Sequence, residues 1–241
     1  MSVLREVALT LRPPPGDRHG PLVPLLVALT FLTGLVDAVS YLTLGHVFVA
    51  NMTGNVVFLG FALAGASGLS AVASLIALAA FLLGALAGGW LGSREAHRGR
   101  LLRNANASQA ALIGLALVIA LVAPEPLSEG VRYGLISALA LAMGAQNAAA
   151  QRLAVPELTT TVLTRTLTGI ASEASFLGGA GSQLGRRGLA VAMMLLGALA
   201  GAALALHVSV AATLALALAL STAVGLAANA VSSSDAAWTH G

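Results

Sequence analysis

Long apolar runs, broken by short polar turns, occupy most of the chain. About 20 apolar residues in a helix are enough to cross the hydrocarbon core of a bilayer. Gly, Ser and Pro residues, which favour turns, separate the runs, so the pattern predicts a series of membrane-spanning helices. Eight spans are predicted, at 21–44, 47–65, 70–92, 108–123, 131–151, 158–178, 189–206 and 208–228. Some are barely long enough, which leaves six or seven crossings open. The expected fold class is an all-α, polytopic transmembrane helical bundle.

Composition points to the same class. Hydrophobic residues make up 58% of the 241 residues and charged residues only 9%, whereas soluble domains carry about 25% charged residues. The chain has no Cys, which excludes disulfides and thiolate chemistry. Its twelve basic residues are all Arg and, with the abundant Ala, Gly and Leu, they indicate a bacterial protein. A formal net charge of +3 over loop arginines is ordinary for a membrane protein and does not indicate nucleic-acid binding.

The N-terminus reads as a polar segment followed by a retained first span. The apolar run that begins at Pro21 continues for more than twenty residues. A signal peptide has an apolar core of only about 7–15 residues before its cleavage site. The predicted organisation is a polar segment at 1–20, a transmembrane repeat at 21–123, a central loop at 124–130, a second repeat at 131–228 and a polar tail at 229–241.

Three matches in the same order predict an internal duplication. Gly34 and Asp37 match Gly144 and Asn147, Thr53 matches Thr164, and LLGALAG at 82–88 recurs at 195–201. With four spans in each half, the halves would cross the membrane in the same sense, as in parallel-repeat transporters. Each copy of LLGALAG also holds a Gly-x-x-x-Gly pair that favours close helix packing. These packing pairs are Gly84 with Gly88 and Gly197 with Gly201.

Eight crossings leave the orientation undecided. They put six arginines on one side of the membrane and five on the other, which is no asymmetry under the positive-inside rule. The dense cluster at 93–104 is the clearest single cytoplasmic signal. The tie is also what an error of one in the number of spans would produce.

Polar side chains recur at helical spacing inside the predicted spans and define a candidate site. Thr33, Asp37 and Tyr41 follow one stripe of the first span. The stretch VFVANMTGNVVFLG at 47–60 is unusually polar for its surroundings, and Gly54 permits a local break in the helix. Irregular backbone at membrane depth is tolerated where it lines a cavity. The candidate pathway residues are Asp37, Tyr41, Asn51, Thr53, Asn55, Asn147, Gln151, Thr164 and Arg165.

Ionisable groups sharpen this hypothesis, because each costs about 2.5–3.5 kcal/mol at the centre of a membrane helix. Asp37, Arg165 and Glu173 all fall within predicted spans. Such groups normally face the bundle interior and pair with one another, so Asp37 and Arg165 are the expected pair. Alternatively, Arg165 and Glu173 lie near span ends and snorkel to the interface, or the pair only fixes helix packing.

Three stretches, GLVDAVSYLTLGHVFVANMTGN, MGAQNAAAQRL and TTTVLTRTLT, resemble the YoaK-like family of bacterial integral membrane proteins, which has no assigned function. The resemblance covers the chain from about Pro21 onward. It implies a multi-spanning protein of the bacterial inner membrane and implies no substrate. In the second half, Arg165 stands where the first half has the Gly of Thr-Gly-Asn, so the halves differ chemically.

The sequence lacks a Walker A lysine, a Gly-x-Ser-x-Gly elbow and metal-ligand spacing among its five His residues. We therefore expect no enzyme, cofactor or metal site. The expected function is transport of a small solute or ion, with Asp37 as the proton- or cation-responsive group and Arg165 as a counter-charge or an anion contact. The alternative is a structural or interaction membrane protein whose buried polar residues only fix packing. The expected partners are the lipid bilayer and an unidentified solute or ion, with no nucleic acid, and a homo-oligomer is left open.

Overall fold

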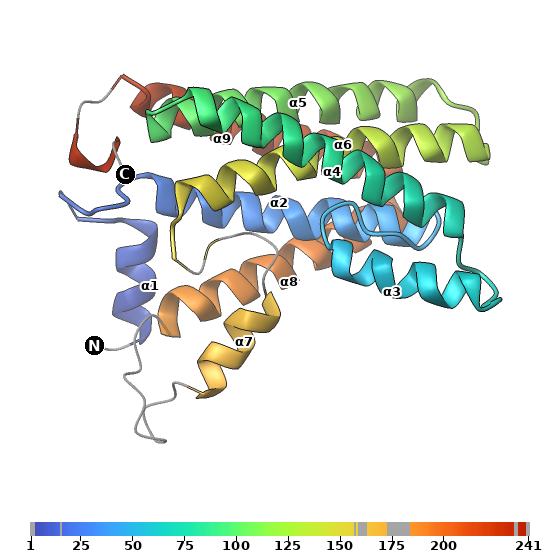
Figure 1. The fold of residues 1–241 in the computed structure, drawn as a ribbon, viewed down its shortest axis with the longest axis horizontal. Coiled ribbons are helices and arrows are strands. Elements are labelled where there is room, and N and C mark those ends of the chain that lie inside the picture. Colours follow the sequence, from blue (N-terminus) through green and yellow to red (C-terminus); the bar gives the residue numbers. More distant parts are fainter. Residues whose placement is uncertain are drawn as a thin grey trace.

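The computed structural model describes residues 3–14, 16–156, 158, 163–172, 184–233 and 236–239, and every regular element in these ranges is a helix. Both termini lie at the same end of a bundle of long helices (Figure 1). The all-α fold class is therefore confirmed. The helices are α1 (Val3–Leu11), α2 (Leu22–Thr43), α3 (Met52–Leu63), α4 (Ala71–Arg94), α5 (Arg98–Val122), α6 (Glu129–Leu153), α7 (Leu163–Ser172), α8 (Leu184–His207) and α9 (Val210–Val231), with a short 3-10 turn at Ala237–Thr239.

Five of the described helices, α2, α4, α5, α8 and α9, are long and apolar enough to cross a membrane. In contrast, α3 has only 12 residues, well short of the roughly 20 that a crossing needs, and α7 has 10, with residues on both sides of it outside the described ranges. The prediction of eight spans is therefore not confirmed by the described helices. For α3 the cause is clear: the residues before it, 47–50, are as apolar as the helix but not helical, so hydropathy merges the two.

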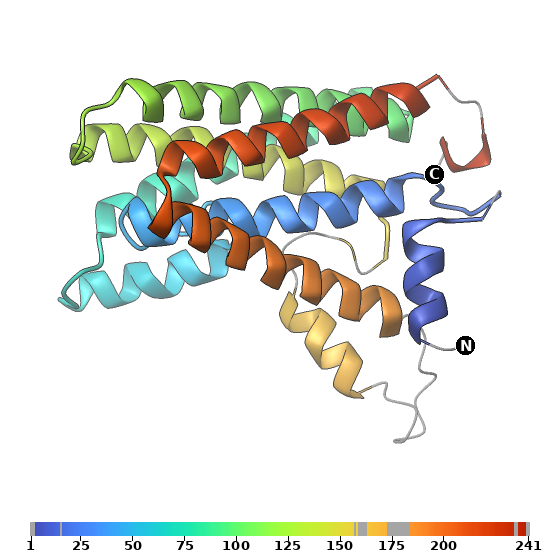
Figure 2. The same cartoon turned by 180° about the vertical axis from the view of Figure 1, so that it is seen from behind.

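The chain turns back after α2, and α3 then runs in the same direction as α2. Gly45 has φ 117° and His46 φ 55°, left-handed values that glycine adopts at little cost. Asn51, just before α3, binds Asp37 of α2, and further along both helices the Phe58 ring of α3 lies 5.8 Å from the Tyr41 ring of α2. Both views show α3 ending near the same end of the bundle as α2 (Figures 1 and 2). Thus α2 and α3 do not form an up-and-down pair.

Glycines bring two pairs of long helices into backbone contact, α2 with α8 and α4 with α6. At each of six glycines an added Cβ would lie within 3.0 Å of a carbonyl oxygen on the partner helix. Residue numbers rise together on the two helices of each pair, so both pairs are parallel. The glycines, with the residue that supplies the carbonyl, are Gly34 (Met194), Gly84 (Leu141), Gly88 (Ala145), Gly144 (Phe81), Gly197 (Phe31) and Gly201 (Leu35).

The third pair, α5 with α9, is antiparallel, because Asn106 of α5 binds the Ser221 carbonyl while Gly114 lies near Leu218. The first helices of the two predicted repeats, α2 and α6, run in opposite directions in both views (Figures 1 and 2). The predicted parallel relation between the halves therefore does not hold. It rested on four crossings in each half, and the short α3 removes one of them.

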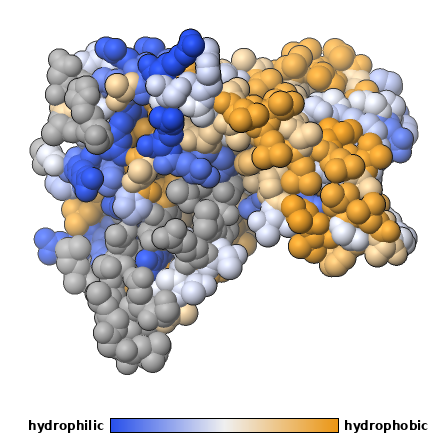
Figure 3. Space-filling view, viewed as in Figure 1, coloured by the Kyte–Doolittle hydropathy of each residue, from blue (hydrophilic) through white to orange (hydrophobic). Residues whose placement is uncertain are grey.

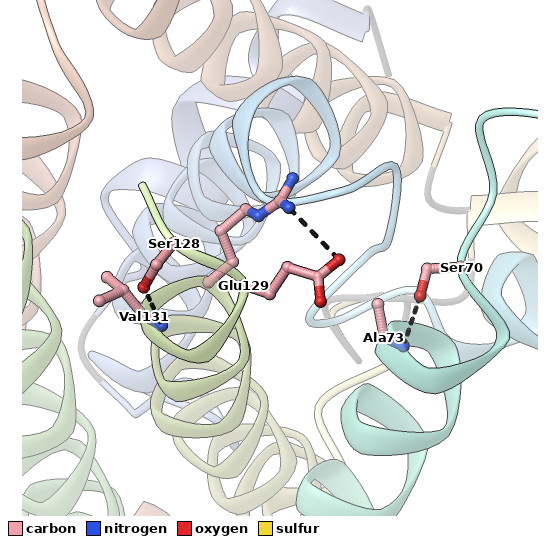
Figure 4. A network of polar contacts seen from close by, with 6 residues as sticks. Ser70, Ala73, Ser128, Glu129 and Val131 are labelled. Carbon is pink, nitrogen blue, oxygen red and sulfur yellow. Dashed lines mark hydrogen bonds and ion pairs between the residues drawn. The ribbon is translucent and has the colours of Figure 1, made fainter. Parts of the chain in front are cut away.

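Serine caps start three helices at the end of the bundle away from the termini. Ser70 Oγ accepts a hydrogen bond from Ala73 N at 3.1 Å at the start of α4, and Ser128 Oγ accepts one from Val131 N at 3.4 Å at the start of α6 (Figure 4). Ser209 caps α9 in the same way. Such caps satisfy N–H groups that have no partner inside the helix. The exposed Glu129–Arg132 ion pair, at 3.9 Å, lies beside them.

The surface divides along the bundle axis. Hydrophilic residues gather at the end that holds the termini, and hydrophobic residues cover the other part of the face shown (Figure 3). Large apolar side chains on the long helices are exposed, among them Leu86, Leu121, Leu199 and Leu226. Exposed apolar surface of this extent is typical of contact with lipid.

Candidate functional site

Asp37 of α2 binds the irregular segment 47–51 that precedes α3. Its Oδ1 accepts hydrogen bonds from Val49 N at 2.9 Å and Ala50 N at 2.8 Å, and its Oδ2 accepts one from Asn51 Nδ2. The side chain is buried. Backbone that is not helical must find other partners for its N–H groups when it lies within a membrane. A carboxylate, which only accepts, fits three converging donors.

Asn55 of α3 binds the same segment from the other side. Its Oδ1 accepts from Phe48 N at 2.8 Å, while its Nδ2 donates to Phe48 O at 2.6 Å. The amide thus pairs with the backbone of Phe48 as a neighbouring strand would. Asn55 is fully buried. The polar residues of the 47–60 stretch therefore support an irregular backbone.

An aromatic cluster covers this segment. Tyr41 stacks on Phe48 with ring centres 5.1 Å apart, and His46 and Phe58 also pack on Tyr41. Thr53, by contrast, is exposed. The structure thus brings Asp37, Tyr41, Asn51 and Asn55 together around one segment and leaves Thr53 outside.

The two candidate residues of α6 border a separate cavity of about 370 Å³ between α4 and α6. Asn147 is buried and its Nδ2 donates to Met143 O at 3.0 Å. Gln151, one turn later, is exposed. The lining residues are Phe81, Ala85, Gly89, Asn147, Ala148, Gln151 and Arg152.

A second cavity, of about 410 Å³, lies at the end of the bundle near the termini and shares Arg152 with the first. Its charged or titratable lining residues are Arg18, His19, Glu95, Arg98 and Arg152. The two cavities together extend from the basic end of the bundle to Asn147.

Arg98 fixes the wall of this second cavity. Its guanidinium donates to the carbonyls of Arg18 and Trp238, each at 3.3 Å, and to the carbonyl of Leu153. It also lies 3.1 Å from His19 Nδ1. Because arginine only donates, His19 Nδ1 must accept, which leaves the imidazole proton on Nε2. One buried arginine thus ties together both chain ends and the last turn of α6.

The pKa of His19 reflects both its burial and its positively charged surroundings. Burial lowers this pKa from its ordinary value, and the nearby guanidinium of Arg98 lowers it further. Arg186 and Arg18 act in the same direction, while Asp17 opposes them. His19 is therefore neutral at physiological pH and adds no charge to the cavity.

Two candidate residues of α7 are not brought to these cavities by any described contact. Thr164 is exposed. The side chain of Arg165, like residue Glu173, lies outside the described residues, so the predicted Asp37–Arg165 pair stays a prediction. Among the described residues, the groups that bind Asp37 are backbone N–H groups and the Asn51 amide.

A buried amide chain was missed by the sequence analysis. Gln109 Nε2 of α5 donates to Gln146 Oε1 of α6, whose Nε2 donates to Thr33 Oγ1 of α2 at 3.1 Å. All three residues are buried. Gln146 stands next to Asn147 inside a predicted span, a signal that could have identified it. The chain links the three helices at the middle of the bundle.

Within the described residues, no cluster of three or more His, Cys, Asp or Glu could hold a metal ion. Chemically, the arrangement offers two cavities that share Arg152, one bordered by the amides of Asn147 and Gln151 and one lined by three arginines. It also offers a carboxylate committed to backbone donors.

Comparisons with known proteins agree with a membrane protein. The UPF0700 transmembrane protein YoaK of Bacillus subtilis (strain 168) is 32% identical over 151 residues, which are 63% of this chain and 66% of that protein. The matched part thus spans slightly less than two thirds of this relative. No solved structure matches the chain significantly. The family described as "Protein of unknown function (DUF1275)" matches residues 25–227. The chain therefore belongs to the DUF1275 family of transmembrane proteins similar to YoaK.

Proposed function

We propose that this protein transports a small solute or ion across the bacterial inner membrane, through a path between two related, inverted halves. The observation that carries the proposal is a difference between equivalent positions. Asn147 borders a cavity that shares Arg152 with the cavity at the basic end, whereas its counterpart Asp37 is bound to the irregular segment before α3. The proposal assigns no catalytic role to any residue.

The glycine contacts support an internal duplication. Gly34 of α2 lies against Met194 and Ala198 of α8, and Gly144 of α6 lies against Phe81 and Ala85 of α4. The sequence matches relate α2 to α6 and α4 to α8. One contact is therefore the other with the halves exchanged. Since α2 and α6 run in opposite directions, the halves would be inverted, as in many secondary transporters built around interrupted helices.

Six crossings, by α2, α4, α5, α6, α8 and α9, fit this arrangement. The 25 residues of α6 would extend about 37 Å, enough for a bilayer. Ten arginines then fall at the end with the termini, against Arg132 alone at the other end. This asymmetry replaces the tie of the eight-span interpretation and supports a cytoplasmic location for the termini. The ten are Arg5, Arg12, Arg18, Arg94, Arg98, Arg100, Arg103, Arg152, Arg186 and Arg187.

The asymmetry between the halves suggests how transport would work. In an inverted-repeat transporter, each half adopts in turn the conformation of the other, which opens the site to alternate sides. In the conformation described above, the second half would be open toward the cytoplasm. The first half would be closed by the irregular segment 47–51 and the aromatic cluster around Tyr41. In the opposite state, Asp37 would release Val49 and Ala50 and border the path as Asn147 does now. Asp37 would then respond to protons or cations.

Uptake into proteoliposomes tests this proposal. A panel of inorganic ions, organic anions and neutral solutes is offered to liposomes with wild-type protein, the Asn147→Leu variant or the Thr53→Ala variant. We expect uptake of one solute class by wild type and Thr53→Ala, and its loss in Asn147→Leu, whose side chain would fill the cavity. Correctly folded wild type with uptake no greater than empty liposomes would contradict transport and favour a structural membrane protein.

A further inference from the structure

We infer that the cavity at the basic end binds anions, and that its natural occupant carries a carboxylate or phosphate group coordinated by Arg152. Among the described residues that line it, three are arginines, Arg18, Arg98 and Arg152, and one, Glu95, carries a carboxylate. The excess of two positive charges is concentrated in a hollow of about 410 Å³. A cationic substrate would meet repulsion there, and a neutral one would gain little from such charge.

Arg98 supplies fixed charge and few hydrogen bonds. Four of its five N–H groups already point at the carbonyls of Arg18, Trp238 and Leu153 and at His19 Nδ1. It is buried, so its charge is poorly screened by water. This guanidinium therefore raises the potential of the cavity without being the main ligand.

Arg152 differs from Arg98 because most of its donors are unspent. Its Nη1 donates to Gly92 O at 3.1 Å, the single acceptor found for it among the described residues. A purely structural role for Arg152, in which it satisfies a carbonyl in the last turn of α4, accounts for that one bond and not for its other donors. The exposed guanidinium also lines both cavities. Such a planar fork matches the paired oxygens of a carboxylate or phosphate.

The amides beyond Arg152 suit the same ligand. Gln151 and Asn147 lie one and five residues before it on α6 and line the inner cavity. The Gln151 amide can donate to an oxygen of an anion without adding negative charge. An anion held at Arg152 would thus lie beside the cavity that Asn147 borders. Movement of the anion from Arg152 toward Asn147 rests on the proposed function, whereas binding of the anion at Arg152 does not.

Binding to the full chain in phosphatidylcholine nanodiscs tests the inference. Inorganic phosphate and succinate serve as probes, with choline chloride and glucose as controls at constant ionic strength, and thermal stability or calorimetry as the readout. We expect saturable binding of one of the two anions, at least about tenfold weaker in Arg152→Gln. The matched control Arg132→Gln removes an arginine at the other end and should bind like wild type.

Further variants keep the test informative if Arg152→Gln folds poorly. Arg152→Lys keeps the charge but loses the planar fork, and Gln151→Leu leaves all three arginines intact, so each should weaken binding by a smaller factor. If adding phosphatidylglycerol abolishes the phosphate effect, the anion site is supported and its occupant is a lipid headgroup. Equal affinities of Arg152→Gln and Arg132→Gln, or no binding beyond chloride, would overturn the inference. Anion binding without uptake of any solute would instead contradict the proposed function, and uptake of a neutral solute or cation without anion binding would contradict only the anion site.

Discussion

Replacing Gly144 by alanine tests the packing of α6 against α4. The added Cβ would lie within 3.0 Å of Phe81 O and also close to Ala85 N. A carbon and a carbonyl oxygen normally stay about 3.3–3.6 Å apart even in close helix contacts. Because both obstacles are backbone atoms, no side-chain rotation relieves the clash. The two helices must therefore separate along the whole contact.

The expected cost follows from two opposing effects. Alanine favours the helix over glycine by about 1 kcal/mol, while overpacking a close contact costs about 1–3 kcal/mol. Gly134, on the same helix, has no atom within 4 Å of an added Cβ, so only the favourable effect applies there. We expect Gly144→Ala to lower the free energy of unfolding by up to about 2 kcal/mol and Gly134→Ala to raise it by up to about 1 kcal/mol, a difference of about 1–3 kcal/mol between the two variants.

Reversible unfolding in mixed detergent micelles, followed by far-ultraviolet circular dichroism, measures this difference. Gly197→Ala provides an independent repeat, because its Cβ would meet Phe31 O across the α2–α8 contact. Gly60→Ala, also free of neighbours within 4 Å, is its control. Equal unfolding midpoints for Gly144→Ala and Gly134→Ala would refute the backbone contact between α4 and α6.

The polar residues give three further predictions. Asp37→Ala leaves two backbone N–H groups unpaired, so it should destabilise the protein by about 2–6 kcal/mol and speed proteolysis within 44–51. Asp37→Asn keeps one acceptor oxygen and should have a smaller effect. Equal proteolysis rates for Asp37→Ala and wild type would contradict the binding of this segment by Asp37. Asn55→Ala should lower the melting temperature, since it removes both bonds to one backbone unit, while the exposed Thr53→Ala should not change it; a similar loss in both would argue against the reciprocal pair. Gln146→Ala should destabilise by about 1–3 kcal/mol, because Gln109 loses its acceptor; in Gln109→Ala/Gln146→Ala the two losses should be less than additive, and strict additivity would contradict their contact.

The long helices could be predicted from the sequence, and the short ones could not. The predicted span 70–92 is close to α4, and 208–228 to α9, because an apolar run of that length has few alternatives. Residues 47–50 are as apolar as most of α3, so hydropathy does not separate the irregular segment from the helix that begins at Met52. Polar residues that bind irregular backbone have the same composition as residues that line a path. Asp37 and Asn55 therefore suggested a pathway before their hydrogen bonds were known.

The start of α5 shows a second limit of hydropathy. Hydropathy predicts that the fourth span begins at residue 108, but α5 begins at Arg98, inside the polar segment 93–104. Arg98 and Asn106 are buried because they bind carbonyls of other segments. A charged residue whose partners lie far away in the sequence cannot be distinguished from a loop residue by local pattern. The same long-range contacts hid the basic cavity.

The pairing of α2 with α8 has a consequence for biosynthesis. The ribosome completes α2 at Thr43 but does not begin α8 until Leu184. At about 5–20 residues per second, α2 waits roughly 7–30 s for its partner. During that time the face around Gly34 must remain among lipids or insertion factors, while α4 finds α6 sooner. Substitutions on that face should therefore reduce the yield of inserted protein in cells more than they reduce the stability of the finished molecule.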